Sequence, residues 1–199
     1  MTNRKQTNYD ESQNDPQSPV HEAGVFPQQE LTPNTIDDLE AEDEETEALF
    51  VASNGCNVRW RVAKSLLTLR DEVNQAAPQR SKASDGTIGD AAHCRRQSDH
   101  NPWVRDGNIG VVTAMDITDD VPHGCSANSI AESIRSRRDA RVKYIIWNRR
   151  IANSSSIGTN PPWVWRDYTG SNPHTQHIHI SVKSDKPNYD SIAEWQVET

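Results

Sequence analysis

Hydrophobic residues recur at helical spacing in two stretches of the chain. In residues 58–75 the apolar side chains follow at steps of three and four, which places them on one face of an amphipathic helix. This face consists of Val62, Leu66, Leu69 and Val73. Pro78 ends this predicted helix. A second helix is predicted over residues 126–138, where Ser126 can cap the first turn and Ile130 and Ile134 share one face.

Short runs rich in β-branched and aromatic residues predict strands between polar, Gly- and Pro-rich connections. The predicted strands are residues 111–117, 142–147, 151–152, 163–166 and 177–182. The predicted connections are residues 81–90, 98–110, 148–150 and 153–162. Strands and helices of mixed spacing predict an α+β domain, in which helices flank a small antiparallel sheet.

Charge divides the chain into two predicted parts. Residues 1–50 contain 13 acidic and 2 basic side chains, whereas residues 51–199 contain 16 acidic and 19 basic ones. Few large apolar residues precede Leu49, so the first part cannot bury enough surface to offset its ordering entropy. We therefore expect a disordered acidic leader over residues 1–50 and a folded domain over residues 51–199. The leader is either a solubilising tail or a docking segment for a basic partner.

Several classes of protein are disfavoured by the composition. No apolar run approaches the length of a membrane span, and the N-terminus lacks the apolar core of a signal peptide. The three cysteines, Cys56, Cys94 and Cys125, are too few and too scattered for a disulfide framework and are expected to be free thiols. The weak positive charge of the domain, without a basic stripe that interleaves with aromatics, argues against nucleic-acid binding.

Histidine and aspartate side chains converge in the predicted strands. Side chains alternate between the faces of a strand, so His177 and His179 point to the same side, about 7 Å apart. Asp116 follows an apolar run, where a buried carboxylate needs a partner or a metal ion. With His100 upstream, these residues offer three ligands and leave one position open, as in a catalytic zinc site. His174, at the mouth of the last strand, is a candidate general base.

Each of these residues also has a structural interpretation when it is taken alone. A His-x-His pair on a strand often consists of surface or structural histidines, and Asp116 could bond backbone groups at a strand end. The metal-site interpretation is favoured because it accounts for His100, Asp116 and His179 together.

The motifs resemble those of the zinc D-Ala-D-Ala carboxypeptidase family, which shares its site architecture with lysostaphin-type and Hedgehog domains. The resemblance covers residues 58 to 183 and rests on three segments: Ser98-Asp99-His100, Ala114-Met115-Asp116 and His177-Ile178-His179. It implies that His100, Asp116 and His179 bind Zn²⁺. It also implies that His177 faces the reaction centre and that His174 belongs to the same site. The loop between His100 and Asp116 is longer than is usual in that family.

The family also uses an arginine ahead of the first histidine to hold the substrate carboxylate or polarise its carbonyl. The candidates here are Arg80, Arg95 and Arg96. Asp90 and His93 are candidates for orienting a ligand imidazole, and His123 is expected on a surface turn.

The resemblance implies a metallopeptidase that cuts peptidoglycan stem peptides, as a D-Ala-D-Ala carboxypeptidase or an endopeptidase. The stretches 80–102, 139–147 and 168–175 resemble peptidase domains of phage lysins and prophage proteins. Without a signal peptide, such an enzyme is expected in the host cytoplasm with release to the wall, or in a virion. Two alternatives stay open. One is a virion component with an inactive or accessory peptidase-like domain, anchored to virion proteins by its leader. The other is a recognition domain that holds wall peptide without cutting it.

Overall fold

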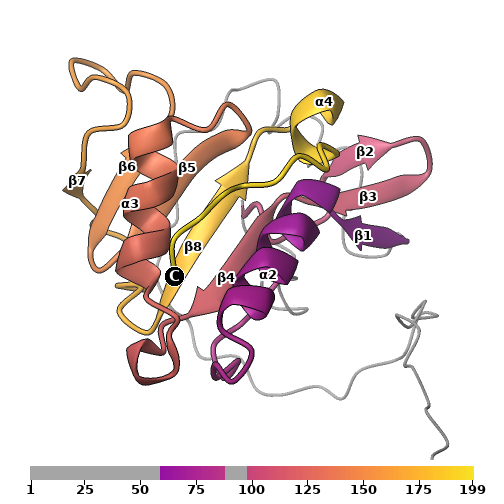
Figure 1. The fold of residues 1–199 in the computed structure, drawn as a ribbon. Coiled ribbons are helices and arrows are strands. Elements are labelled where there is room, and N and C mark those ends of the chain that lie inside the picture. Colours follow the sequence, from indigo (N-terminus) through magenta and orange to yellow (C-terminus); the bar gives the residue numbers. More distant parts are fainter. Residues whose placement is uncertain (1–58, 88–97) are drawn as a thin grey trace, which may run out of the picture. The chain divides into compact units, whose positions relative to one another are not determined.

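The computed structural model describes residues 59–87 and 98–199 (Figure 1). These residues form two sheets and three α-helices, which confirms the α+β class. The helices of this part are α2 (Lys64–Ala76), α3 (Ala127–Arg137) and α4 (Lys186–Tyr189), with a 3-10 turn at Val121–His123. The predictions that lie outside the described residues concern the leader 1–50, Cys56, Asp90, His93, Cys94, Arg95 and Arg96.

The larger sheet has five antiparallel strands, and its second strand is the last strand of the chain. Their spatial order is β4 (Ala114–Thr118), β8 (His177–Val182), β5 (Val142–Trp147), β6 (Arg150–Asn153) and β7 (Arg166–Asp167). Strands β5 and β8 have the predicted limits. Because β8 lies between β4 and β5, its side chains have a neighbouring strand on both sides.

The two faces of this sheet differ in chemistry because side chains alternate along each strand. One face is apolar and packs against α2 and α3, which lie on the same side of the sheet in Figure 1. The strand residues of this core include Met115, Ile117, Ile145, Ile178, Ile180 and Val182, all almost fully buried. The opposite face of β8 therefore carries His177, His179 and Ser181.

The helices follow the predicted apolar spacing. In α2 the side chains of Leu66, Leu69 and Val73 are buried. Helix α3 begins after Ser126, whose Oγ accepts a hydrogen bond from the backbone N–H of Ser129, as the capping prediction requires. Cys125, just before this cap, is buried and free, and its thiol donates to the carbonyl of Thr118.

The start of the first predicted helix is wrong. Residues Trp60–Val62 form strand β1, and the helix begins only at Lys64. Val58, Trp60 and Val62 alternate with arginines, so this segment also has the two-residue period of a strand. Pairing with the parallel strand β3 selects that conformation.

The predicted loop 98–110 and the predicted strand 111–117 are also corrected. Strands β2 (Val104–Asp106) and β3 (Ile109–Val112) form a hairpin that joins β1 in a three-stranded sheet. The turn begins at Gly107, whose φ of +61° suits glycine. At Thr113 the chain passes to the larger sheet: its N–H donates to the carbonyl of Asp99 and its carbonyl accepts from Val182. The apolar run 111–117 thus belongs to two sheets, and the change from one to the other at Thr113 cannot be recognised from hydrophobicity.

The strand predicted at residues 163–166 forms later, at Arg166–Asp167. Trp163 has a φ of +64°, which is incompatible with an extended strand, and its side chain lies in the core. Trp165 packs against that core, and its indole N–H donates to Glu132. Both tryptophans therefore contribute to packing.

Among residues 59–87 and 98–199, no helix has the length and apolar character needed to span a membrane.

The apolar face of β8 should dominate stability. Replacing the fully buried Ile180 by alanine should lower the free energy of unfolding by about 3 kcal/mol, because lost burial and a cavity add. The matched control is Ile192→Ala, at a side chain that is 77% exposed, which should change it by less than about 0.5 kcal/mol. Urea denaturation measures both, and equal effects would contradict this placement of the core.

Candidate metal centre

The register between β4 and β8 brings two predicted ligands together. Asp116 lies directly opposite His179 in the antiparallel ladder, so both side chains project from the same face. Asp116 Oδ1 is 3.1 Å from His179 Nδ1. The other edge of β4 is bonded to Gly86, whose N–H and carbonyl exchange hydrogen bonds with the backbone of Asp116. Asp116 is thereby held from both sides.

The third predicted ligand, His100, comes from the loop before β2. Its backbone N–H donates to Ser98 Oγ, and its ring Nδ1 lies 3.0 Å from the carbonyl oxygen of Thr87. A carbonyl can only accept, so Nδ1 carries the ring proton and Nε2 keeps a free lone pair. Nε2 lies 3.1 Å from His179 Nδ1 and 3.4 Å from Asp116 Oδ1.

These three atoms form a triangle of the size that a small divalent cation requires. Its edges are 3.1, 3.1 and 3.4 Å. With bonds of about 2.0–2.1 Å to nitrogen or oxygen, the ligand atoms of tetrahedral zinc lie about 3.3 Å apart. Lone pairs of two neutral imidazoles repel at such a distance, unless a proton or a cation lies between them. His100, Asp116 and His179 therefore fit Zn²⁺ in both donor type and spacing.

His179 is oriented by two neighbours on its own face of the sheet. Its Nε2 lies 2.9 Å from the hydroxyl of Ser181, two residues along β8. The Nε2 proton can donate to that hydroxyl, which leaves Nδ1 as the atom available to a metal. The ring of Tyr144, from β5, stacks on the imidazole at an interplanar angle of 6°. These two contacts therefore hold the imidazole of His179 in one plane.

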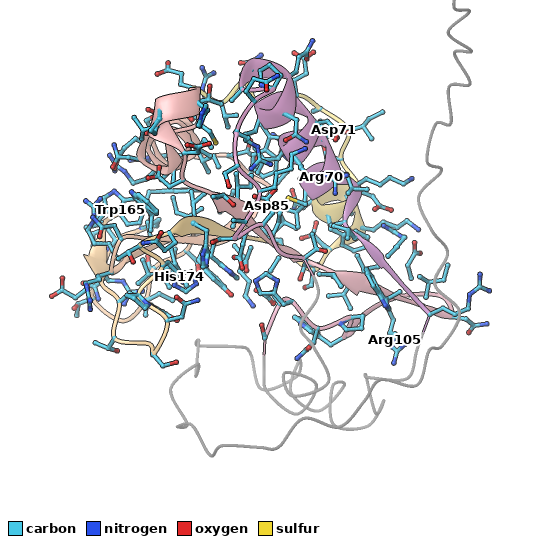
Figure 2. The ribbon with its side chains drawn as sticks, turned by 90° about the horizontal axis from the view of Figure 1, so that it is seen from below. Arg70, Asp71, Asp85, Arg105, Trp165 and His174 are labelled. Atoms are coloured by element: carbon cyan, nitrogen blue, oxygen red, sulfur yellow. The ribbon has the colours of Figure 1, made fainter. Side chains whose placement is uncertain are left out.

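The other two predicted histidines border the same triangle. His177 Nε2 is 3.8 Å from Asp116 Oδ2, and the rings of His174 and His177 meet edge to face with centroids 5.1 Å apart. The ring of His174, labelled in Figure 2, is also 5.5 Å from that of His179. The structure thus brings together all five histidine and aspartate residues that the sequence assigns to the site.

A backbone constraint holds His174 in place. The β5–β6 hairpin turns through Asn148 and Arg149, both with positive φ, and their N–H groups donate to the carbonyls of His174 and Pro173. His174 itself has a φ of +48°, a backbone conformation that residues other than glycine rarely adopt. The hairpin turn therefore fixes the segment that presents this imidazole.

Burial and mutual contact set the protonation of the site. Burial disfavours the charged form of Asp116, but the neighbouring imidazoles of His100 and His179 outweigh it and hold its pKa well below the usual range. Burial opposes the charged form of His100, yet Asp116 raises its net pKa. Burial lowers the pKa of His174 to about 3, with a contribution from the neighbouring His179, and burial also lowers the pKa of His177. At neutral pH, His174 and His177 are therefore neutral, and a pKa of about 3 makes His174 a weak proton acceptor.

The structure places Arg80 in a different role from the predicted substrate clamp. Its side chain is fully buried, and the guanidinium donates to both carboxylate oxygens of Asp85, to Asn74 and to the carbonyl of Ser81. Asp85 also accepts from the N–H and hydroxyl of Thr118 on β4. Arg80 thus fastens the segment that contains Gly86 and Thr87 to the sheet. Arg96, which the sequence also makes a candidate for the clamp, lies outside the described residues.

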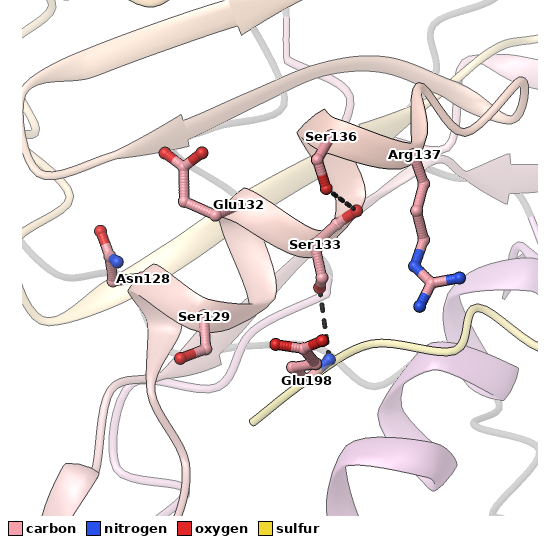
Figure 3. A pocket seen from close by; sticks show the side chains of 7 residues that line it. All are labelled: Asn128, Ser129, Glu132, Ser133, Ser136, Arg137 and Glu198. Atoms are coloured by element: carbon pink, nitrogen blue, oxygen red, sulfur yellow. Dashed lines mark hydrogen bonds between the residues drawn. The ribbon is translucent and has the colours of Figure 1, made fainter.

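The described part of the chain has surface hollows beside the site and on α3. One is lined by Arg70, Asp71, Asn74, Lys82, Asp85, Gly86, Thr87, Met115 and Asp116, so it reaches a predicted ligand. The other, shown in Figure 3, lies on α3 and the C-terminal segment and includes none of the five site residues. It is lined by Asn128, Ser129, Glu132, Ser133, Ser136, Arg137 and Glu198. His123 lies away from the site on an exposed turn, as predicted, and pairs with Asp120.

Sequence reasoning missed the residues that support the ligands: Asp85, Gly86, Thr87, Tyr144 and Ser181. The position of Ser181 could have been predicted, because it follows His177 and His179 at the two-residue period of one strand face. Thr87 and Gly86 act through backbone atoms, which leave no signature in the residue type.

The Arg80–Asp85 pair should carry a pH-dependent part of the stability. Burial alone would raise the pKa of Asp85, but hydrogen bonds from Arg80 and Thr118 lower it below 3.8. The contribution of this carboxylate is therefore fully present above pH 3.8 and is lost as the pH falls through the lower, folded-state pKa. Asp85→Asn should cost about 3 kcal/mol at pH 7, and the difference from wild type should shrink on acidification below pH 3.8.

The control for this experiment is Asp71→Asn, at an exposed position of α2 that lines the same hollow as Asp85; both residues are labelled in Figure 2. The change in unfolding free energy should be below about 0.5 kcal/mol and nearly independent of pH. A similar cost for the two variants in urea denaturation would contradict the assignment of Asp85 as a buried anchor.

Ser181 should tune the metal affinity through His179. In Ser181→Ala the Nε2 proton of His179 loses its acceptor, so zinc affinity should fall by about 10- to 100-fold. Competition with a chromophoric chelator measures this affinity. Ser133→Ala, at another buried serine on α3, is the matched control and should leave the affinity unchanged. Unchanged affinity in Ser181→Ala would show that this contact does not orient the ligand.

Comparison with protein-family models, with curated proteins and with solved structures finds no match to the chain. The geometry of the described residues and the motifs themselves therefore carry the functional argument.

Proposed function

We propose that the chain is a zinc-dependent peptidase that acts on peptidoglycan stem peptides. The observation that carries this proposal is the triangle of His100 Nε2, Asp116 Oδ1 and His179 Nδ1, with edges of 3.1 to 3.4 Å. Three protein ligands leave a coordination position for water or substrate, which distinguishes catalytic zinc sites from structural ones. When bound there, zinc supplies Lewis acidity, which lowers the pKa of a water molecule and polarises a carbonyl group.

The remaining chemistry belongs to His177 and His174. Both are neutral at neutral pH, because burial lowers the pKa of each imidazole. A neutral imidazole can take a proton from an attacking water and return it to the leaving amine, and such transfer contributes about 10²- to 10⁴-fold to a rate. His177 is the better placed for this, since Nε2 lies 3.8 Å from the carboxylate of Asp116. His174, whose ring meets that of His177 edge to face, stabilises the resulting charge or relays the proton.

The substrate assignment rests on the motifs. Ser98-Asp99-His100, Met115-Asp116 and His177-Ile178-His179 resemble the zinc D-Ala-D-Ala carboxypeptidase family, and neighbouring stretches resemble phage-lysin domains. The cleaved bond is proposed to be a stem-peptide bond, by carboxypeptidase or endopeptidase action, in a lytic enzyme of a phage or prophage.

Substitutions should separate metal binding from catalysis. Asp116→Ala and His179→Ala should lose zinc and all cleavage, because each removes one corner of the triangle. His177→Ala should retain one zinc ion and lose about 10²- to 10⁴-fold in turnover, since it removes the proton acceptor. The measurements are zinc content by elemental analysis and cleavage of purified muropeptides by chromatography with mass detection.

The matched control is His123→Ala, at an exposed histidine away from the site, which should keep both zinc and activity. If the wild-type chain with one bound zinc ion leaves every muropeptide intact, the peptidase proposal fails. That result would favour the inactive or accessory domain of a virion. Binding of wall peptide without cleavage would instead favour a recognition domain.

A further inference from the structure

The side of the site away from the zinc triangle contains unsatisfied polar atoms. Both ring nitrogens of His177 and the Nδ1 of His174 are buried and have no hydrogen-bond partner among the described residues. His174 is only 6% exposed, so water does not readily compensate for the missing bonds. Buried polar groups without partners are rare in folded proteins and destabilise them. Their presence at one place indicates a ligand that satisfies them.

The carboxylate of Asp116 connects this side to the zinc triangle. Its Oδ1 is one corner of the triangle with His100 Nε2 and His179 Nδ1, which is the first set of ligand atoms. Its Oδ2 lies 3.8 Å from His177 Nε2. The ligand atoms of Asp116, His174 and His177 all lie within 4.8 Å of one another. A carboxylate can bind one cation through each oxygen, so Asp116 can serve both sets at once.

We propose that Asp116, His174 and His177 form a second divalent-cation site, weaker than the zinc triangle, and that its occupation inhibits the enzyme. Asp116 bridges the two ions, with Oδ1 on the first and Oδ2 on the second. Two imidazoles and a carboxylate select zinc or a similar transition metal over magnesium or calcium, which prefer oxygen ligands.

The spacing of the ligand atoms accounts for the lower affinity of the second site. The first set is already at coordination spacing, with edges of 3.1 to 3.4 Å, whereas the second contains gaps of 3.8 Å and more. The imidazoles of His174 and His177 must move inward, and the hydrogen bond from the N–H of Asn148 to the carbonyl of His174 restrains the backbone of that segment. The two ions also share one carboxylate and repel each other. Together these effects should make the second ion bind at least about 100-fold more weakly than the first.

Inhibition follows because the second ion occupies the lone pairs of the His174 and His177 imidazoles. An imidazole bound to a cation cannot accept a proton, so His177 and His174 lose the role that catalysis requires of them. This part rests on the proposed peptidase function, whereas the binding of the second ion does not. Zinc would then activate the enzyme at low concentration and inhibit it at higher concentration.

The binding test is a zinc titration of the full chain followed by native mass spectrometry and calorimetry. Wild type should bind one ion tightly and a second at least about 100-fold more weakly. His174→Ala and His177→Ala should each keep the first ion and lose the second. His123→Ala should keep both events, because that histidine lies outside the site. A single ion in wild type, or a second event that survives in His177→Ala, would overturn the proposal.

Cobalt gives a readout that an unrelated surface site would not produce. Two Co²⁺ ions bridged by Asp116 are close enough to couple magnetically, so the electron paramagnetic resonance signal should weaken as the second equivalent is added. A signal that simply doubles in the wild-type protein would refute the bridged pair. This experiment needs no variant, so a variant that fails to fold cannot obscure the result.

The inhibition test follows muropeptide cleavage in zinc-buffered solutions. Turnover should fall with the same midpoint as the second binding event, by at least about tenfold at saturation. Full activity with both sites occupied would overturn the inhibitory role. An absence of cleavage at every zinc concentration would instead refute the proposed peptidase function, while the titration and the cobalt signal would still decide the second site.

Discussion

The pairing of β4 with β8 is the constraint on which the rest of the site depends. It places Asp116 opposite His179, and it directs both side chains, with His177, away from the apolar core. A slip of this register by one residue would turn the ligands into the core and expose Ile178 and Ile180 instead. The free energy of burying those isoleucines therefore stabilises the site as well. Hydrophobic packing on one face of the sheet and the cluster of histidine and aspartate side chains on the other are two consequences of the same alignment.

The sequence is most informative where one physical signal dominates. The limits predicted for strands 142–147 and 177–182 are correct, because apolar β-branched runs end there at polar turns. The cap at Ser126 is predictable because a hydroxyl directly before an amphipathic stretch is typical of a helix N-terminus. His177 and His179 can be assigned to one face because His-x-His on a strand fixes two directions at once, whereas the assignment of His100 depends more on the resemblance of the motifs. The predicted start of α2 is wrong because Val58 to Val62 satisfies both helical and strand periods, and pairing with β3 decides between them.

Other features cannot be predicted from the sequence because they depend on distant partners. The loop after His100 is long because it contains the β2–β3 hairpin, whose strands are too short to be recognised before their pairing with β1 is known. Arg80 has the bidentate geometry that suits a substrate carboxylate, but the same geometry suits Asp85, five residues later. Residue type alone does not distinguish an arginine that binds substrate from one that anchors a loop. Burial does, and burial is a property of the folded chain.

The contact between His100 and Thr87 has a consequence for how such sites vary over time. The acceptor is a backbone carbonyl, so the imidazole depends on where the chain runs at position 87 and not on which side chain stands there. Position 87 can therefore drift in sequence while its contribution persists. A scan of side-chain substitutions would record it as neutral, although the peptide group there holds the imidazole of His100 in place. Part of what maintains this site is therefore the conformation of the backbone. Neither side-chain substitution nor comparison of residue types can detect that contribution.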